Sequence, residues 1–274
     1  MRMSVRIMIR GAGDLASGIA WRLYQAGYKE ILMAEIGIPT TVRRTVAFSP
    51  AVYQGEMTVE GVTAKLVTDP EETEKALEEG HIALIVDFEA ESRKWYKPDI
   101  LIDAILAKRN LGTKIDYADF VIGVGPGFTA QVDCNCVIET KRGHYLGRVL
   151  TEGSAVPDTG VPGNIGGFTS ERIIRAGGEG SFHALRKIGD LVKRGEKLAE
   201  VTDDLTGQKT VTYANIDGVV RGMLQENVHV TEGMKSGDVD PRGQVEYCET
   251  ISDKALGIAG GVLQAVSAFD FSRR

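Results

Sequence analysis

The amino-acid sequence predicts an α/β protein, in which a parallel-sheet domain is followed by a small all-β module and a C-terminal helix. Three observations lead to this prediction. The first part of the chain alternates apolar runs of strand length with helical patterns. After Arg175 the helical periodicity disappears, and short Val-rich runs are separated by Gly-Asp and Gly-Glu turns. Helical spacing returns only near the C-terminus.

Composition limits the class of protein. The chain has 274 residues, of which 43% are apolar and 26% charged, so we expect a globular protein of one or two domains. The formal net charge of -6 argues against a nucleic-acid partner, because such a protein must neutralise phosphates. Three cysteines are too few for a disulfide framework and suit a reducing compartment.

The first elements form a strand, a glycine turn, a helix and a second strand. Val5–Ile9 is an apolar run of strand length, and the turn Gly11–Gly13 follows it. Asp14–Gln25 has apolar residues at helical spacing, and Ile31–Ala34 is a second strand that ends at Glu35. This order predicts a βαβ unit, the building block of a Rossmann-like parallel sheet.

A hairpin and a capped helix come next. Glu56–Val59 and Val62–Val67 flank a Glu-Gly turn and predict two antiparallel strands. Asp69 is placed as the N-cap of a short helix, with Pro70 at its first position and Glu72 completing a capping box. Further apolar runs predict parallel strands over Ile82–Asp87, Ile100–Ile102 and Phe120–Val124.

The predicted β module contains an internal repeat. Its residues recur at an offset of 38 positions: Gly180, Phe182, Leu185, Val192, Gly195 and Val201 match Gly218, Val220, Met223, Val230, Gly233 and Val239. This pairing of halves resembles a biotinyl or lipoyl barrel-sandwich module. We expect no biotin or lipoyl attachment, because Lys209 is displaced from the hairpin tip and lacks the attachment motif.

We therefore place a Rossmann-like nucleotide-binding domain at 1–175, the barrel-sandwich module at 176–245 and a C-terminal segment at 246–274. The helix expected over Asp253–Phe269 has an apolar stripe that returns to the first domain. Its apolar length is too short to span a bilayer, so we expect a cytoplasmic protein without a membrane partner.

The glycine turn is the first candidate site. Gly11, Gly13 and Ala16 match the pattern G-x-G-x-x-A, which lets backbone approach a pyrophosphate at a helix N-terminus. Glu35 lies at the end of the next strand, where a carboxylate accepts ribose hydroxyls. The alternative is a turn kept only for close packing, and Asp14 favours it because its charge would repel an anion.

Four further residues are weaker candidates for the same site. Arg44 follows Glu35 in the chain, and Lys108 follows the apolar run Ala104–Ala107. Either side chain could clamp a phosphate bound near the glycine turn, and the alternative for both is plain surface charge. Gly125 and Gly127 follow a predicted strand, and such a glycine run forms either an anion-holding nest or a plain turn.

Cys134 and Cys136 are the candidate nucleophiles. In an extended chain, residues two apart point the same way, so the two thiols would share a face. The alternative is a pair of inert buried side chains. The four histidines lie far apart and form no zinc motif, so we expect no metal site.

Several longer strings resemble the YqeB-type proteins of selenium-dependent molybdenum hydroxylase systems. The resemblance is carried by Ile9–Ala16, Val42–Phe48, Asp103–Asn110, Gly125–Ala130 and Gly237–Arg242. It implies an accessory protein that helps to mature or load the selenium-containing molybdopterin cofactor, with the hydroxylase and its maturation proteins as partners. In the family pattern Cys134 has a counterpart, whereas Cys136 need not.

The sequence thus leads to a preferred function and two alternatives. The preferred function is a maturation factor that binds molybdopterin dinucleotide or NAD(P) near Gly11, Gly13, Glu35 and Gly125, with Cys134 contacting or relaying sulfur or selenium. The first alternative is an NAD(P)-dependent oxidoreductase that uses the same site. The second is a non-catalytic docking scaffold whose glycine turn binds nothing.

Overall fold

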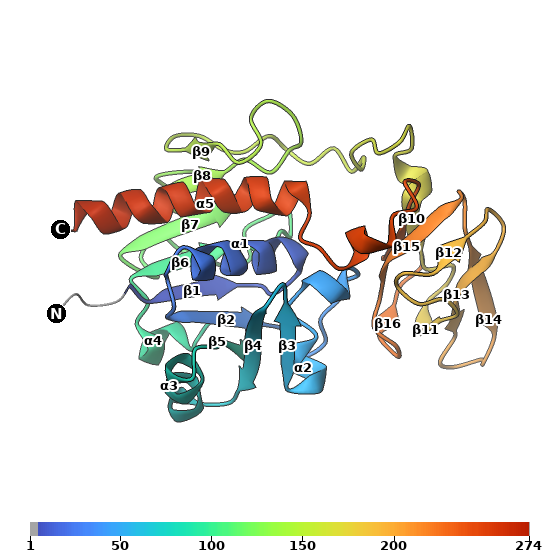
Figure 1. The fold of residues 1–274 in the computed structure, drawn as a ribbon, viewed down its shortest axis with the longest axis horizontal. Helices are drawn as coiled ribbons and strands as arrows, with labels where there is room; N and C mark the ends of the chain where they lie inside the picture. Colours follow the sequence, from blue (N-terminus) through green and yellow to red (C-terminus); the bar gives the residue numbers. More distant parts are fainter. Residues whose placement is uncertain (1–4, 274) are drawn as a thin grey trace. The chain divides into compact units, whose positions relative to one another are not determined.

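The computed structural model describes residues 5–273, which divide into two compact units (Figure 1). The first unit comprises Met1–Pro39, Ala47–Thr159 and Ile251–Arg274, and the second comprises Thr40–Val46 and Gly160–Thr250. The division therefore falls after residue 159, whereas the sequence placed it after residue 175.

The first unit contains a nine-stranded mixed sheet in the order β3-β4-β5-β2-β1-β6-β7-β8-β9. Neighbours from β4 to β8 are parallel, whereas β3 and β9 pair antiparallel at the two edges. The strands are β1 (Ile7–Arg10), β2 (Ile31–Glu35), β3 (Glu56–Val59), β4 (Val62–Val67), β5 (Ile82–Val86), β6 (Ile100–Asp103), β7 (Phe120–Val124), β8 (Cys136–Ile138) and β9 (Val149–Leu150).

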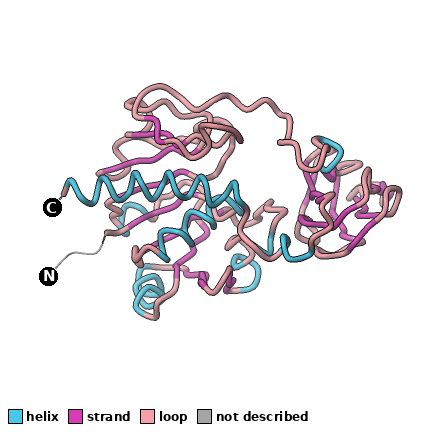
Figure 2. The backbone as a smooth tube through the Cα atoms, turned by 45° about the horizontal axis from the view of Figure 1, so that its top comes forward, coloured by secondary structure: helices cyan, strands magenta, loops and turns pink. Residues whose placement is uncertain are grey.

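The predicted fold class, a Rossmann-like parallel sheet followed by a barrel-sandwich module, is wrong. The large sheet is mixed, because the β3–β4 hairpin and the β8–β9 return each add an antiparallel strand at an edge. Helices also do not follow each strand, as Figure 2 shows for the loop between β6 and β7. Leu106 and Lys108 in that loop have φ values of +61° and +64°, which a right-handed helix does not allow.

Helices α1 (Asp14–Gln25) and α5 (Asp253–Ser272) pack against each other, and α5 also contacts β8 and β9 (Figures 1 and 2). A Cβ on Gly18 would lie 2.9 Å from the Cβ of Ala255, so the close approach needs glycine there. Smaller helices are α2 (Ala51–Gln54), α3 (Pro70–Glu78) and α4 (Arg93–Tyr96). The helix α3 begins as expected, because Asp69 accepts a hydrogen bond from the Glu72 amide at 2.9 Å.

The segment Val245–Ser272, which includes α5, contains an 18-residue window with a mean hydropathy of 1.3, so by length and composition alone it could cross a membrane, as the core helix of a soluble protein also could. The expectation that this segment is too short was wrong, since α5 runs to Ser272. Ala255, Ile258 and Val262 of α5 are nevertheless buried inside the folded unit. Each unit is compact and has its own buried apolar core, as the domains of soluble proteins do.

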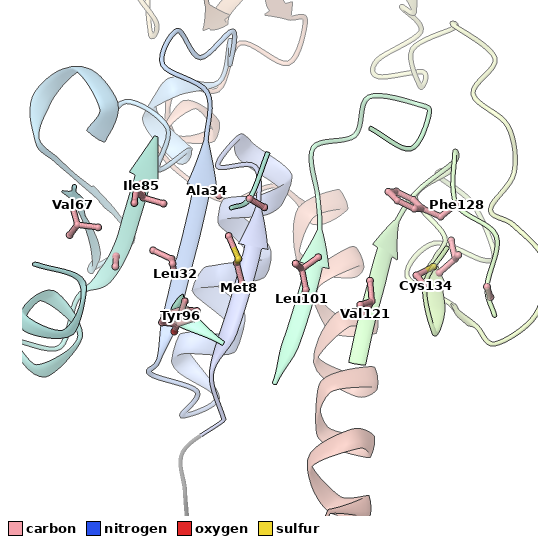
Figure 3. Packing of buried hydrophobic residues seen from close by; sticks show 14 of the residues in the cluster. Met8, Leu32, Ala34, Val67, Ile85, Tyr96, Leu101, Val121, Phe128 and Cys134 are labelled. Carbon is pink, nitrogen blue, oxygen red and sulfur yellow. The ribbon is translucent and has the colours of Figure 1, made fainter. Parts of the chain in front are cut away.

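One face of the large sheet packs a cluster of apolar side chains. Met8, Leu32, Leu101 and Val121 come from four neighbouring strands, and Tyr96 packs with them (Figure 3). Because successive residues of a strand point to opposite faces, Ile7 and Ile9 lie on the other side of β1.

The second unit consists of two four-stranded antiparallel sheets, β10-β17-β15-β12 and β14-β13-β11-β16. Strands β11, β12 and β13 begin 38 residues before β15, β16 and β17, the spacing of the sequence repeat. The strands are β10 (Ile173–Arg175), β11 (Gly180–Ala184), β12 (Leu191–Val192), β13 (Lys197–Thr202), β14 (Lys209–Tyr213), β15 (Gly218–Met223), β16 (His229–Val230) and β17 (Lys235–Asp240). The short strand β12 of the first repeat pairs with β15 of the second, and the short strand β16 of the second repeat pairs with β11 of the first. Each repeat therefore adds a strand to the sheet that contains the other repeat's first strand.

Candidate functional site at the carboxyl ends of the parallel strands

The parallel strands β1 and β6 are neighbours, but the chain leaves them in opposite directions across the sheet. From β1 it continues to β2, which pairs with β5, whereas from β6 it continues to β7 and β8. In open sheets with parallel strands, ligands bind beyond the carboxyl ends of two adjacent strands whose following connections run in opposite directions. We call the residues at this point the carboxyl-edge site: Arg10–Asp14, Glu35, Phe88, Asp103 and Thr113.

The turn after β1 brings backbone close to the neighbouring strand. Gly11 has a φ of +96°, and a Cβ there would lie 3.0 Å from the carbonyl oxygen of Ala104. Gly13 is the N-cap of α1 with a φ of -68°, and as a glycine it offers the first amides of the helix no side-chain hydrogen bond. Ala16 is buried under this turn. The helix α1 therefore begins at the carboxyl-edge site, with Asp14 as its first residue.

Glu35 holds the turn in place. Its Oε2 accepts a hydrogen bond from the Ala12 amide at 2.7 Å, and its Oε1 accepts one from the Ile36 amide at 2.8 Å. Burial raises the pKa of Glu35, and these two hydrogen bonds act in the opposite direction. Because a carboxylate oxygen has two lone pairs, Glu35 can accept a further hydrogen bond from a ligand. Its predicted contact with ribose stays a prediction.

A buried ion pair lies beside the turn, and sequence reasoning missed it. Arg10 is only 2% exposed, and its guanidinium donates to the Oδ2 of Asp103 at 3.3 Å and to the carbonyl of Phe88 at 2.8 Å. The hydroxyl of Thr113 donates to the same Asp103 oxygen at 2.6 Å. Burial raises the pKa of Asp103, whereas Thr113 and Arg10 lower it. The sequence signal that could have revealed this pair is Arg10, a charged residue that directly follows the apolar run Ile7–Ile9.

Apolar side chains border the site on the side of β2 and β5. Ile38, Val86 and Phe88 are exposed to 61%, 48% and 49%. A Cβ on Gly37 would lie 3.6 Å from Val86, so the segment after β2 runs next to the end of β5. Exposed apolar side chains beside a helix N-terminus suit a ligand with both a flat ring and an anionic group.

Two other predicted site residues, Arg44 and Lys108, bind side chains or backbone that are not part of the carboxyl-edge site. Arg44 belongs to the second unit, where its Nε donates to the Met223 carbonyl at 2.8 Å and its Nη1 to Gln225 at 2.7 Å. Lys108 is exposed and pairs with Asp158 at 2.7 Å. The structure thus shows Arg44 bound to other residues of the second unit and Lys108 bound to Asp158 in the first.

The second glycine run is packed against the chain itself. A Cβ on Gly127 would lie 2.5 Å from the Cα of Arg109, and one on Gly125 would lie 2.9 Å from the hydroxyl of Thr140. Both glycines also have positive φ values, of +109° and +85°. Glycine at these two positions therefore lets the segment after β7 approach Arg109 and Thr140 closely; their predicted contact with an anion stays a prediction.

Cys134 and Cys136 are buried free thiols. Burial raises the pKa of Cys134 to about 11 and that of Cys136 to about 12. Cys134 packs in the apolar cluster near Phe128 and Val121 (Figure 3). Since the thiolate is the reactive form, this environment is that of an inert thiol and gives no support to a relay of sulfur or selenium.

No family model matches the chain. Solved structures with some likeness include the ectoine utilization protein EutE (DoeB) from Ruegeria pomeroyi and a succinylglutamate desuccinylase from Silicibacter sp.. The apo EutE structure is 11% identical, with 86% of each chain covered and a TM-score of 0.27. The desuccinylase is 11% identical, with 87% of this chain and 85% of that chain covered and a TM-score of 0.27. At these scores the likeness carries no argument about function.

A much stronger likeness is found in sequence. The chain is 50% identical over 260 residues to the "Uncharacterized protein YqeB" of Escherichia coli (strain K12). The match covers 95% of this chain and 47% of that protein, so the chain spans about half the length of its relative. On this identity along nearly its whole length, the chain is a YqeB-type protein.

Proposed function

We propose that the carboxyl-edge site binds a nucleotide-bearing ligand, with the phosphates at the N-terminus of α1. The observation that carries this proposal is the N-terminus of α1, whose cap Gly13 makes no side-chain hydrogen bond and which follows the Gly11 turn beside the carboxyl ends of β1 and β6. The first amides of a helix point at such a position, and the helix dipole favours an anion there.

The surroundings favour a dinucleotide over a simple anion. Ile38, Val86 and Phe88 offer exposed apolar surface for a flat ring, and Glu35 offers an acceptor for ribose hydroxyls. The candidate ligands are molybdopterin dinucleotide and NAD(P). We do not assign catalysis to the site, because the groups nearest the turn, Glu35 and Asp103, already bind backbone or buried side chains.

In this proposal the protein acts in the cytoplasm as an accessory factor for a selenium-dependent molybdenum hydroxylase. It would hold the dinucleotide form of the cofactor, and the hydroxylase and its maturation proteins would be its partners. The buried Cys134 has no part in this version of the function. We expect no lipoyl or biotinyl arm on the second unit; Lys209 lies on the strand β14 and pairs with Glu200 at 2.6 Å.

The experiment is a thermal-shift titration with NAD, NADP, CTP and molybdopterin dinucleotide. A ligand at about 100 times its Kd stabilises the folded state by about 2.7 kcal/mol, which corresponds to a Tm rise on the order of 5–10 °C. Gly13→Asp places a negative charge at the α1 N-terminus, and Gly13→Ser is the matched control. Both side chains are good N-caps, and the φ of -68° suits either, so both variants should fold.

The proposal expects a shift that Gly13→Asp abolishes and Gly13→Ser retains. A shift with NAD or NADP alone, together with a substrate-dependent change in nicotinamide absorbance, would favour the oxidoreductase. Absence of any shift would contradict the nucleotide site and favour a docking scaffold.

A further inference from the structure

The loop between β8 and β9 has an unusual charge for this chain. Residues 139–148 contain three Lys or Arg residues and one acidic residue, the buried Glu139, whereas the whole chain has a net charge of -6. We call residues Lys141–Arg148 the basic loop. It belongs to the first unit and does not include any residue of the carboxyl-edge site.

The basic loop is anchored on α5 by close backbone contacts. A Cβ on Gly147 would lie 2.3 Å from the Gly257 carbonyl oxygen, and a Cβ on Gly261 would lie 2.0 Å from the Gly147 carbonyl oxygen. Glycines on both sides therefore let the loop touch the helix backbone. Figure 1 shows α5 beside β8 and β9, the two strands that the loop connects.

Hydrogen bonds fix the ends of the same loop. The guanidinium of Arg142 makes two parallel hydrogen bonds to the carboxylate of Asp253, at 2.5 and 2.9 Å. The Gly147 amide donates to the Glu139 carbonyl at 2.9 Å, and the Lys141 amide donates to the Glu139 side chain at 2.7 Å. The loop thus has little conformational entropy left to lose when something binds to it.

The side chains that the loop presents to solvent are aromatic and cationic. Tyr145 is 56% exposed, and the guanidinium of Arg148 lies 4.9 Å from the centre of its ring. The ring of His144 meets Tyr145 edge to face at 4.9 Å. Lys141 is exposed, and neither Lys141 nor Arg148 forms an ion pair with any residue between 5 and 273.

We propose that the basic loop is a docking surface for an acidic face of a partner protein. Tyr and Arg are the residues that most often dominate binding energy at protein interfaces, and a rigid loop binds at a lower entropic cost. Charge complementarity identifies the partner surface as one rich in Asp and Glu, with an apolar site for the Tyr145 ring. A nucleic acid is disfavoured, because two unpaired cations neutralise few phosphates and the rest of the chain repels a polyanion.

The test uses a fluorescein-labelled dodecapeptide of Asp, Glu and Leu, followed by fluorescence anisotropy on the full chain at low and at physiological salt. Lys141→Glu is compared with Lys114→Glu, which makes the same charge change at an exposed site of the same unit away from the loop. Tyr145→Ala tests the contribution of the ring. Circular dichroism and Tm show whether each variant is folded.

We expect salt-sensitive binding that Lys141→Glu and Tyr145→Ala each weaken by about tenfold, whereas Lys114→Glu changes it less than about twofold. Absence of peptide binding, or equal effects of the two Lys→Glu variants, would overturn the proposal. A single-stranded RNA that binds more tightly than the peptide, and depends on Tyr145, would also overturn it. The dinucleotide thermal shift should be unchanged in Lys141→Glu, so failure here is distinguishable from failure of the proposed ligand site.

Discussion

Replacing Arg10 by Met should destabilise the first unit strongly and in a pH-dependent way. Arg10 joins the ends of β1, β5 and β6, because its guanidinium binds both Phe88 and Asp103. Met fills much of the same volume but donates no hydrogen bond. The carboxylate of Asp103, which is itself 2% exposed, would then keep only Thr113 and the Ile105 amide as donors.

The expected loss is about 3–5 kcal/mol, the usual cost of removing one partner of a buried ion pair. At about 2–4 °C per kcal/mol for a chain of this size, Tm should fall by on the order of 10 °C. The folded-state pKa of Asp103 is raised by burial, so this group favours the folded state only where it is protonated. Without Arg10 the pKa rises further, and the loss should be largest near neutral pH and smaller in mild acid.

Urea denaturation at neutral pH and in mild acid measures both effects. The control is the double variant Arg10→Met with Asp103→Leu, which removes both charges and should be more stable than Arg10→Met alone. Equal losses at the two pH values, or a double variant whose loss is the sum of the two single losses, would refute the buried ion pair as the source of stability.

Three further predictions concern the thiols, a glycine and a cap. Because burial raises the pKa of Cys134 to about 11, the native protein should react with a thiol reagent far more slowly than the unfolded protein, and fast labelling of Cys134 would contradict its core position. Gly127→Ala should lower the free energy of unfolding by more than Gly112→Ala. Both glycines have positive φ, but only a Cβ on Gly127 would lie 2.5 Å from backbone, at the Cα of Arg109. Equal losses in urea denaturation would show that this contact is unimportant. Asp69→Ala should cost about 1 kcal/mol through loss of the α3 N-cap, and a Tm unchanged in calorimetry would argue against that cap.

Much of the local structure could be predicted from sequence, because it depends on neighbouring residues. The helix over Asp14–Gln25 and the strands of the Glu56–Val67 hairpin have the expected bounds. The strands of the β module recur at the expected offset of 38 residues. The global class was wrong, because the antiparallel return from β8 to β9 and the helix-free connection after β6 depend on tertiary pairing and on loop φ values that apolar periodicity does not report.

The candidate site was only partly predictable. The glycine turn and Glu35 do come together, since both follow neighbouring parallel strands. Arg10 and Asp103 were missed because a partner 93 residues away cannot be read from spacing. The partners of Arg44, Met223 and Gln225, could not be read from spacing for the same reason. The buried face of α5 was also hard to assign, because the helix is apolar on most sides; its buried residues include Ala255, Ile258 and Val262.

The most direct test of the central claim is an amide-nitrogen NMR titration with NAD and, separately, with molybdopterin dinucleotide. If phosphates bind at the N-terminus of α1, one of these ligands should shift the amide signals of Gly13, Asp14 and Leu15. In the variant Gly13→Asp, the same ligand should leave the amide signals of Asp14 and Leu15 unchanged. The amide signal of Tyr145, in the basic loop, should not shift with either ligand. Amide signals at the start of α1 that stay unchanged with both ligands would contradict the nucleotide site.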